Sequence, residues 1–342
     1  MTTLYGDISP RTEIHAAKKF LENGIPYVVT EPFCQADSIP KNSSDTMVWR
    51  RYLPLDPTPQ ALQENVTPNA AQMTHEDVTA TLQQYYGGIQ LSEKVMDMHE
   101  DPVLQRGMKL LGQQGAEMAE LVRLGIFRAG SQVMRANGAA RTDINTTLTL
   151  SLQRNVTRLL ERNRAKHFTE VIKSTAAFGT QNIPRAFIGL CHPDLEPVIE
   201  DLAGFKSYVD YGTITPFENE IGSVGRVRYL KTDLLTPWEG AGAAIGGDGM
   251  ISSDGVRNDI YPILYIAKDA LGTVALKGTE VRNNNGKMEP VLPVSIMVTN
   301  AKPSDSDPWA QRNWATFKFY LTAAILQDMW MVRAEVAVPA SV

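Results

Sequence analysis

The sequence has little cysteine, no long apolar run and no excess of basic residues. Its two cysteines, Cys34 and Cys191, stand far apart and fit neither a disulfide framework nor a zinc-ligand spacing, which indicates a reducing environment. No apolar run reaches the roughly 18 residues that a membrane helix requires, and the N-terminus lacks a signal-peptide pattern. We therefore predict a soluble protein that is made in a cytoplasm and has no membrane partner.

The charge balance is slightly acidic. The 342 residues include 33 Lys and Arg against 38 Asp and Glu, a net charge of -5. A dedicated nucleic-acid binder would show a basic excess, so this class is disfavoured, although loose contact with DNA on one face is compatible with the balance. With 43% hydrophobic and 21% charged residues, the composition is that of a globular protein with one large domain or two ordinary ones.

Proline is missing from residues 103 to 183, whereas nine prolines precede this block and eleven follow it. Because proline breaks helix interiors, helices are expected here. The first is predicted over about 101–135, with Asp101 as N-cap and Asn137-Gly138 as stop. At about 1.5 Å per residue it would span roughly 50 Å. Its apolar stripe consists of Leu104, Met108, Leu111, Gly115, Met118, Val122, Ile126 and Val133.

Further elements are predicted from shorter patterns. A second helix is expected over about 147–166, with Leu148, Leu152, Val156, Leu159 and Leu160 on its inner face. A short helix is expected after Pro193, closed by Gly204. Strands are predicted at 186–190, 224–230, 262–267, 273–276 and 291–299. At the C-terminus, alternating apolar residues from 315 to 325 and from 330 to 336, joined near Gln327-Asp328, predict a long β-hairpin.

The most informative segment is a predicted ribbon in the N-terminal third. One β-like stretch covers 46–52, a proline-rich polar excursion covers 54–72, and a second β-like stretch covers 78–86. A two-stranded ribbon with a polar tip is at best marginally stable alone in water. The simplest cover is a neighbouring copy of the same chain, so the ribbon predicts assembly.

Residues suited to contacts between subunits lie in three places. Trp49, Arg50, Arg51 and Tyr52 on the first stretch are types enriched in interfaces, although Trp49 fits a buried position within the subunit equally well. Glu64 and Asn65 lie in the polar tip. Arg154, Arg158 and Arg162 follow at steps of four and form a basic stripe on the second helix. This stripe is read as a solvated face paired locally with Glu161, as inter-subunit ion pairs, or as a contact with phosphates.

The segment that most favours an enzyme interpretation is the glycine-rich loop 240–248. Glycines let a backbone approach a phosphate closely. However, Pro237-Trp238 separates this loop from the preceding strand, no amphipathic helix follows, and the Gly-Lys-Ser/Thr ending is missing. A surface loop is the favoured interpretation, and a phosphate-ligand enzyme using 240–249 is the alternative.

No other pattern predicts catalysis or a metal. Cys191 and His192 are adjacent, so on a strand they point to opposite faces, and we expect a buried thiol beside a helix-capping histidine. No histidine has an i,i+4 partner suited to zinc, and no acidic run has calcium-loop spacing. Catalytic residues, metal ligands and cofactors are therefore not predicted.

Several segments together resemble a known family. They are Ile39–Asn42, Val48–Tyr52, Leu62–Pro68, Asp77–Tyr85, Glu100–Leu104, His192–Asp194, Asn219–Arg228 and Trp314–Arg333. In this order they resemble the major capsid proteins of tailed bacteriophages, in particular the coat-protein family typified by Escherichia phage N-four. The resemblance covers roughly residues 35 to 338.

The resemblance implies an α+β fold, the Hong Kong 97 type (Johnson) capsid fold. Its parts would be an N-terminal arm, the E-loop hairpin, a peripheral domain with a long spine helix, an axial domain, and C-terminal strands that return to the peripheral domain and the adjoining sheet. The corresponding ranges are 1–45, 46–95, 96–140, 141–262 and 263–342.

The function implied by the resemblance is structural. The protein would self-assemble as hexamers and pentamers into an icosahedral virion shell around double-stranded DNA, and would not be an enzyme. Its partners would be further copies of itself, a portal, often a cement protein, and a scaffolding protein that is separate, since no helical pro-segment precedes the arm. The packaged DNA would lie close by without specific contacts. A phage tail or baseplate protein is a further alternative.

Overall fold

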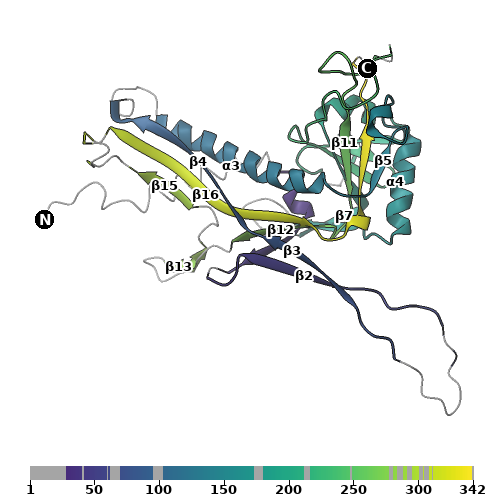
Figure 1. Cartoon of the computed structure of the whole chain (residues 1–342), viewed down its shortest axis with the longest axis horizontal. Coiled ribbons are helices and arrows are strands. Elements are labelled where there is room, and N and C mark those ends of the chain that lie inside the picture. The colour runs from purple at the N-terminus through teal and green to yellow at the C-terminus, as the bar shows by residue number, and fades with distance from the viewer. Residues whose placement is uncertain are drawn as a thin grey trace.

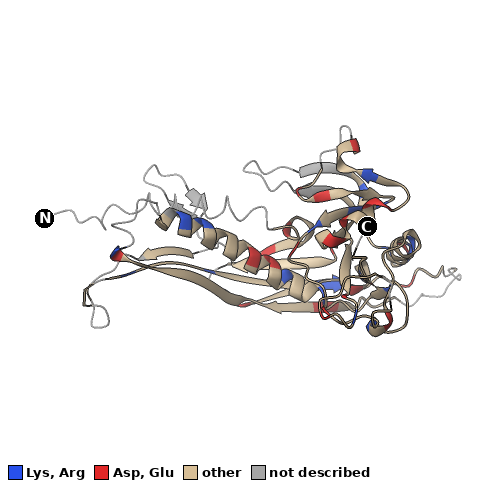
Figure 2. Ribbon diagram, turned by 90° about the horizontal axis from the view of Figure 1, so that it is seen from above, with Lys and Arg blue, Asp and Glu red and all other residues tan. Residues whose placement is uncertain are grey.

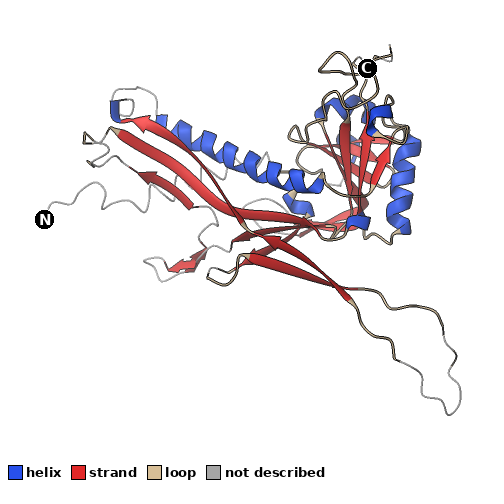
Figure 3. Cartoon of the chain, viewed as in Figure 1, coloured by secondary structure: helices blue, strands red, loops and turns tan. Residues whose placement is uncertain are grey.

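The computed structural model describes residues 28–340 except 41, 60, 62–69, 95–102, 173–179, 212–215, 247–248, 277–279, 283–287, 291–294, 300–302, 304–307 and 310. A long helix, α3 (Val103–Phe127), lies along two long strands, β4 (Gln83–Ser92) and β16 (Arg312–Ile325), and leads to a lobe built around a second sheet (Figures 1 and 3). A ribbon formed by β2 (Thr46–Tyr52) and β3 (His75–Thr81) projects away from both. None of the described helices is long and apolar enough to cross a membrane.

The lobe contains an eight-stranded mixed sheet. Its order is β5-β17-β11-β7-β10-β9-β8, and β6 pairs with β7. Strand bounds are β5 Val133–Arg135, β6 Phe168–Ile172, β7 Thr180–Cys191, β8 Phe205–Ser207, β9 Glu220–Val224, β10 Val227–Lys231, β11 Tyr261–Ile266 and β17 Met331–Val336. Every residue of the central strand β11 is buried, as expected for a strand covered on both faces.

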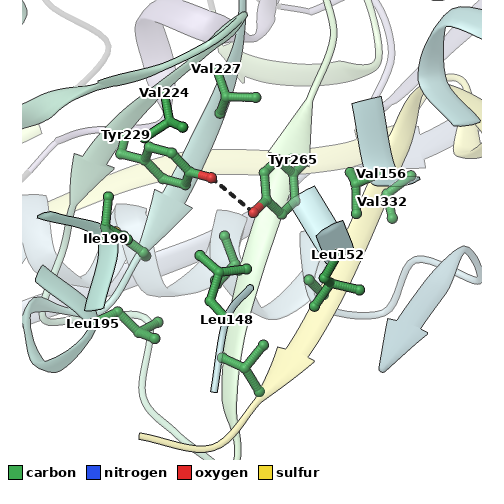
Figure 4. Packing of buried hydrophobic residues seen from close by; sticks show 14 of the residues in the cluster. Leu148, Leu152, Val156, Leu195, Ile199, Val224, Val227, Tyr229, Tyr265 and Val332 are labelled. Atoms are coloured by element: carbon green, nitrogen blue, oxygen red, sulfur yellow. Dashed lines mark hydrogen bonds between the residues drawn. The ribbon is translucent and has the colours of Figure 1, made fainter. Parts of the chain in front are cut away.

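Helix α4 (Leu150–Arg162) covers one face of this sheet. The Thr149 hydroxyl caps it by accepting a hydrogen bond from the Leu152 amide at 3.2 Å. Its buried residues Leu152, Val156 and Leu160 pack against the sheet, and Leu159 is half-buried, so four of the five predicted inner-face residues are confirmed. The helix is shorter than the predicted 147–166, and Leu148, although buried, precedes it. Within this core the Tyr229 and Tyr265 hydroxyls hydrogen-bond each other at 3.1 Å (Figure 4), which satisfies two polar groups far from water.

The other sheet, which contains β4 and β16, lies under α3. It has the order β1-β12-β16-β15, with β4 also paired to β16, and its remaining bounds are β1 Gln35–Ile39, β12 Leu271–Leu276 and β15 Ser295–Thr299. On β16, Ala315, Phe317, Phe319 and Leu321 are buried against Met108 and Leu111 of α3. The predicted alternation is therefore confirmed from Ala315 to Leu321, where one face of the strand packs on the helix, but it is lost beyond Leu321, because Thr322, Ala323 and Ala324 are all buried.

The remaining elements are short. The helix α5 (Glu196–Glu200) follows a 3-10 turn, η5 (Pro193–Leu195), as predicted after Pro193. Other 3-10 turns are η3 (Glu31–Phe33), η4 (Arg141–Asp143), η6 (Tyr208–Tyr211) and η7 (Asp328–Trp330), and β13 (Glu280–Arg282) pairs with β14 (Met288–Pro290).

The long helix is shorter than its pattern predicted. It ends at Phe127, and Val133 belongs to β5, which pairs in parallel with β17. The helix ends where the chain reaches the lobe, and Gly130 there lies so close to Met331 that an added Cβ would be 2.2 Å from the Met331 Cε. Pairing with β17 therefore overrides the helical periodicity beyond Phe127. The predicted cap at Asp101 lies outside the described residues.

Two predicted strands are each broken in the structure. The segment 224–230 is a hairpin, β9 then β10, whose turn contains Gly225 at φ +59°, a conformation that glycine adopts easily. The segment 78–86 divides at Leu82 into β3, which pairs with β2, and β4, which pairs with β16. Both breaks coincide with an interruption of the apolar pattern, at Gly225-Arg226 and at Gln83-Gln84, that the prediction did not use.

The predicted C-terminal hairpin is wrong. Strand β16 pairs with β12 of the sheet under α3, whereas β17 pairs with β11 of the lobe. The chain first passes from one sheet to the other through α3, between β4 and β5, and it crosses twice more, after β11 and after β16. These last two crossings are joined by backbone hydrogen bonds from Leu326 and Gln327 to the Ala270 carbonyl at 2.9 and 3.1 Å. Two separate hydrophobic faces, one under α3 and one in the lobe, draw the two strands apart.

A glycine in the lobe provides a stability test. A Cβ on Gly222 would lie 2.4 Å from the Lys206 carbonyl oxygen and 2.7 Å from the Phe205 ring, so the β8–β9 pairing would have to shift. We expect Gly222→Ala to lower the free energy of unfolding by about 1–3 kcal/mol, measured by denaturant titration. Gly125→Ala on exposed α3 is the control, since open space surrounds Gly125; it is expected to raise stability by up to about 1 kcal/mol. Equal effects would contradict the close approach.

Candidate assembly surface

The β2–β3 ribbon has little contact with the rest of its own subunit. Its two strands pair antiparallel from Thr46 opposite Thr81 to Tyr52 opposite His75, and the segments that follow β2 and precede β3 extend outward beyond that point (Figure 1). Large apolar side chains on and beyond the ribbon are exposed: Val48 by 47%, Tyr52 by 59%, Leu55 by 53% and Met73 by 65%. Such unburied apolar groups at the end of an extended arm are typical of a surface that another chain covers.

Two ion pairs connect the strands of the ribbon. Arg50 makes two hydrogen bonds to the carboxylate of Asp77, at 2.9 and 2.8 Å, and the next pair across the strands, Arg51 and Glu76, also forms an ion pair. The hydrogen bond from Arg50 lowers the pKa of Asp77. Exposed pairs of this kind add little stability but hold the strands in register. Arg50 and Arg51 therefore already have partners within the subunit.

Trp49 and Tyr52 differ in their surroundings. The Trp49 indole Nε1 donates a hydrogen bond to the Asp37 carboxylate at 2.6 Å, which ties the base of the ribbon to β1, and its ring is half-buried. Tyr52 is exposed beside His75, at a ring distance of 6.2 Å. Of the two aromatic candidates, Tyr52 is thus available for a contact, whereas Trp49 is used within the subunit. Glu64 and Asn65 lie outside the described residues.

The three arginines of the α4 stripe are all exposed. The local pairing with Glu161 is not observed, because Glu161 forms its ion pair with Arg226 of the β9–β10 turn. Arg158 donates to the Asn155 side chain at 3.2 Å, and neither Arg154 nor Arg162 has an ion-pair partner among the described residues. The stripe is thus a free basic face in the described part of the chain.

Four amides of the glycine-rich loop are already hydrogen-bonded within the subunit. The Gly240 amide donates to the Asp259 carboxylate at 2.8 Å, and the amides of Gly242, Ala243 and Ile245 donate to backbone carbonyl groups. A phosphate would have to compete with these hydrogen bonds. The geometry therefore does not favour the phosphate-ligand enzyme.

Cys191 and His192 are placed as predicted. The Cys191 thiol is buried and burial raises its pKa, while the His192 Nδ1 accepts a hydrogen bond from the Asp194 amide at 3.3 Å and caps η5. Neither group has the geometry of a nucleophile and base. Within the described residues no group of His, Cys, Asp and Glu is arranged to hold a metal ion.

An exposed aromatic patch on the sheet was missed by the sequence interpretation. Tyr86 on β4 and Trp314 on β16 are 80% and 44% exposed, and Met297 on β15 is 45% exposed. The buried alternation of Ala315, Phe317 and Phe319 requires that Trp314 point to the opposite face, so the signal was present in the sequence. This face is the side of the sheet that α3 does not cover.

A hydrogen-bonded cluster around Glu120, the Glu120 clasp, holds Thr30 and Glu31 of the predicted N-terminal arm (1–45) on α3. The buried Glu120 carboxylate accepts hydrogen bonds from the Thr30 amide at 2.9 Å and the Thr30 hydroxyl at 2.7 Å. Arg123, one turn further, donates to Glu31 at 3.1 Å and to the Thr273 hydroxyl of β12 at 3.3 Å. Burial raises the pKa of Glu120. From the sequence alone, charged residues on a helix such as Glu120 and Arg123 would be expected to face solvent; their burial follows only from the fold.

Basic residues also lie toward both ends of α3, with acidic residues between them (Figure 2).

Glu335 of β17 is the centre of an arginine cluster where α3 meets the lobe. Its fully buried carboxylate pairs with Arg141 at 2.6 Å, with Arg333 at 3.1 Å and with Arg135 at 3.6 Å. Arg141 and Arg128 also stack on Trp238, at 3.8 and 4.3 Å from the ring centre. Burial by itself would raise the pKa of Glu335, but the hydrogen bonds and charges of these arginines lower it below 4.5. Nothing in the sequence brings the four arginines together.

This cluster predicts an acid-dependent stability. Because the folded-state pKa of Glu335 is lowered, its stabilisation is present above pH 4.5 and is lost as the pH falls through the folded-state value. We expect Glu335→Gln to lower the free energy of unfolding by about 2–3 kcal/mol at pH 7, and this difference to shrink under acid conditions. Denaturant titration across pH measures it. Asp77→Asn, in an exposed pair, should remain close to wild type; a pH-independent Glu335→Gln effect would contradict the assignment.

Solved structures share this architecture over nearly the whole chain. The capsid of Ralstonia phage GP4 is similar with a TM-score of 0.64 at 10% identity, over 92% of this chain and 90% of that one. The Cyanophage Pam1 capsid asymmetric unit gives 0.60 at 9% identity, over 92% of both chains. The SrpI encapsulin of Synechococcus elongatus PCC 7942 gives 0.51 at 11% identity, over 100% of this chain and 92% of that one. The chain therefore has the α+β fold of phage capsid proteins, the Hong Kong 97 type, as predicted.

A sequence relative points to the same class. The chain is 24% identical over 257 residues to the major capsid protein of Pseudomonas phage KPP21. The match covers 70% of this chain and 60% of the relative, so the chain spans about three fifths of that protein. No profile of a known protein family matches the chain. The narrower relation to the family typified by Escherichia phage N-four stays a prediction.

Proposed function

We propose that this chain is a tailed-phage major capsid protein, a structural protein that assembles as hexamers and pentamers into the icosahedral shell around the double-stranded DNA genome. The observation that carries the proposal is the sequence match to the KPP21 major capsid protein, together with a fold shared with phage capsids over nine tenths of the chain. The virion capsid would be its location, after synthesis in the bacterial cytoplasm.

The projecting ribbon supports an assembly role. A folded monomer would leave Tyr52, Leu55 and Met73 in water, which costs free energy that a neighbouring subunit recovers by covering them. Heterologous contacts that close into rings give capsomers, and each subunit makes several contacts, so weak contacts add to a stable shell. Tyr52 is the contact residue that we propose first.

The structural parts are proposed by position. The ribbon would be the E-loop, α3 the spine helix, the sheet under α3 the peripheral domain and the lobe the axial domain. The range 263–342 contributes strands to both sheets. Its strands in the sheet under α3 fit the expected return to the peripheral domain, whereas β17 belongs to the lobe. We propose a portal, a separate scaffolding protein and a cement protein as partners.

The fold alone does not distinguish a phage capsid from an encapsulin, since the SrpI encapsulin shares it. The KPP21 relative favours the phage capsid. The proposal also describes a protein without catalytic activity, and the hydrogen-bonded amides of Gly240, Gly242, Ala243 and Ile245 agree with this. A tail or baseplate protein would form rings or tubes and not closed shells.

Electron microscopy tests the proposal. The full-length protein, expressed alone and together with its phage neighbours, is expected to form closed polyhedral shells or free hexameric rings in negative stain. Shells that incorporate a co-expressed portal at one vertex support a phage capsid, whereas portal-free shells under the same conditions favour the encapsulin class. Monomers or dimers in every condition would overturn the proposal.

A further inference from the structure

The lobe carries a cavity of about 390 Å³ at the end of the β9–β10 hairpin. Four cationic side chains line it, and Asp210 is its one carboxylate within the described residues: the cations are Arg185, Lys206, Arg226 and Arg228. Two glycines with positive φ, Gly204 at +89° and Gly225 at +59°, also line it. The space where their Cβ atoms would stand is open, so a ligand can approach the backbone there.

One wall of the cavity is rigid. The Arg228 side chain is only 5% exposed and is held by the fully buried Glu220, with hydrogen bonds of 2.6 and 2.5 Å to the two carboxylate oxygens. The Tyr211 hydroxyl donates to the same carboxylate at 2.7 Å, and the Arg228 guanidinium lies 4.1 Å from the centre of the Phe217 ring. A buried, doubly bonded guanidinium keeps its position without a ligand, which lowers the ordering cost of binding.

The cavity continues into the α4 stripe through Arg226. Arg226 lines the cavity and forms an ion pair with Glu161 of α4. Arg158 and Arg154 lie three and seven residues before Glu161, so they share its helical face. The Gln153 side chain holds α4 against this turn by donating to the Val224 carbonyl at 2.8 Å.

We name the combined area the basic surface and define it by ten residues. The cations are Arg154, Arg158, Arg162, Arg185, Lys206, Arg226 and Arg228, and the carboxylates are Glu161, Asp210 and Glu220. Seven positive and three negative charges leave an excess of four. Because the whole chain has a net charge of -5, the remaining residues carry nine more negative than positive charges. The basic surface is therefore net positive in a chain that is net negative.

We propose that the basic surface binds the phosphate backbone of double-stranded DNA. This inference rests on the proposed function, because an enclosed genome would bring duplex DNA against one face of each subunit. Arginines four residues apart on a helix repeat a positive charge about every 6 Å, which suits a polyanion better than a single carboxylate. The cavity takes one phosphate group, with Arg185 and Lys206 as its exposed donors, and backbone contacts of this kind are independent of base sequence.

The test uses the unassembled full-length chain and a fluorescent duplex of about 20 base pairs, with anisotropy measured over a range of salt concentrations. Arg185→Ala/Lys206→Ala removes two exposed cations of the cavity. Each phosphate contact contributes about 0.9 to the salt slope, so losing the one phosphate in the cavity should lower the slope by about 0.9 and the affinity by about 8-fold near 0.1 M salt. The control Lys109→Ala/Arg257→Ala removes two exposed cations elsewhere and should change the affinity by less than about 2-fold.

The outcomes separate the alternatives. Equal losses in the two double variants, or a wild-type chain that does not bind the duplex, would overturn the proposal. Tighter binding of inorganic phosphate than of the duplex would assign the cavity to a small anion and also overturn it. If the cavity variant bound DNA like wild type but formed no shells, the DNA-binding proposal would be overturned and the surface would serve contacts between copies. Wild-type shells in electron micrographs are scored separately, so a failure to assemble is not mistaken for a failure to bind DNA.

Discussion

Deleting Leu55–Ala70, the outer part of the projecting ribbon, is expected to leave a folded subunit that no longer forms shells. The described residues of this stretch are exposed and contribute no core side chain, so the melting temperature should remain close to wild type. Assembly depends on contacts that each subunit repeats. Losing even about 3 kcal/mol from one contact weakens it by more than 100-fold. Circular dichroism measures folding, and negative-stain microscopy with size-exclusion chromatography measures shells.

A matched variant distinguishes the effect of the length of the ribbon from the effect of its side chains. Replacing the same residues by a glycine-serine segment of equal length retains the reach of the ribbon but removes its side chains, including Leu55. We expect this variant to fail in assembly as well, because a flexible segment has no apolar surface to bury and must be ordered on binding. Normal shells from the deletion variant would show that the ribbon is not an assembly element.

Introducing a charge under the long helix has the largest expected effect on folding. Leu111 is 1% exposed and packs with Phe317 and Phe319 of β16. Leu111→Asp removes about 2–5 kcal/mol of packing and also buries a carboxylate without a partner. The total is comparable to the stability of an ordinary protein, about 5–15 kcal/mol. We therefore expect insoluble or unfolded protein, measured by soluble yield and by circular dichroism.

The neighbouring residue is the control. Leu110 is 65% exposed, so Leu110→Asp should fold and melt close to wild type. Val122→Asp, which the apolar stripe alone would mark as equally severe, should be intermediate, because Val122 is only half-buried. If Leu110→Asp and Leu111→Asp behaved alike, the face by which α3 packs on β16 would be misassigned.

The ribbon could be predicted from the sequence, but the contact residues that are free on it could not. The ribbon was predicted from two β-like stretches around a proline-rich tip, and its strands pair in the register that places Arg50 opposite Asp77. Which contact residues are free was decided by the fold: Trp49 bonds Asp37, Arg50 and Arg51 have partners, and Tyr52 is exposed. A cross-strand partner 27 residues away along the chain leaves no local signal in the sequence.

The same division holds for the basic stripe. The steps of four from Arg154 to Arg162 placed the arginines on one face of a helix, which the structure confirms. Its extension into the cavity joins β7, β8, the β9–β10 turn and α4, segments that meet only through sheet order. The Glu335 cluster and the Glu120 clasp are of this kind too, since each gathers charged residues from distant segments and buries them.

By itself the sequence determined much of the local structure of this protein: the two helices of the proline-free block, the alternating part of strand β16 and the two-stranded ribbon. These follow from side-chain periodicity and backbone preferences, which act over a few residues. Only the tertiary structure decided where α3 ends, that β16 and β17 belong to different sheets, and which charges are buried. Those outcomes depend on pairing between distant segments, because the free energy of burying a face is available only when its partner arrives.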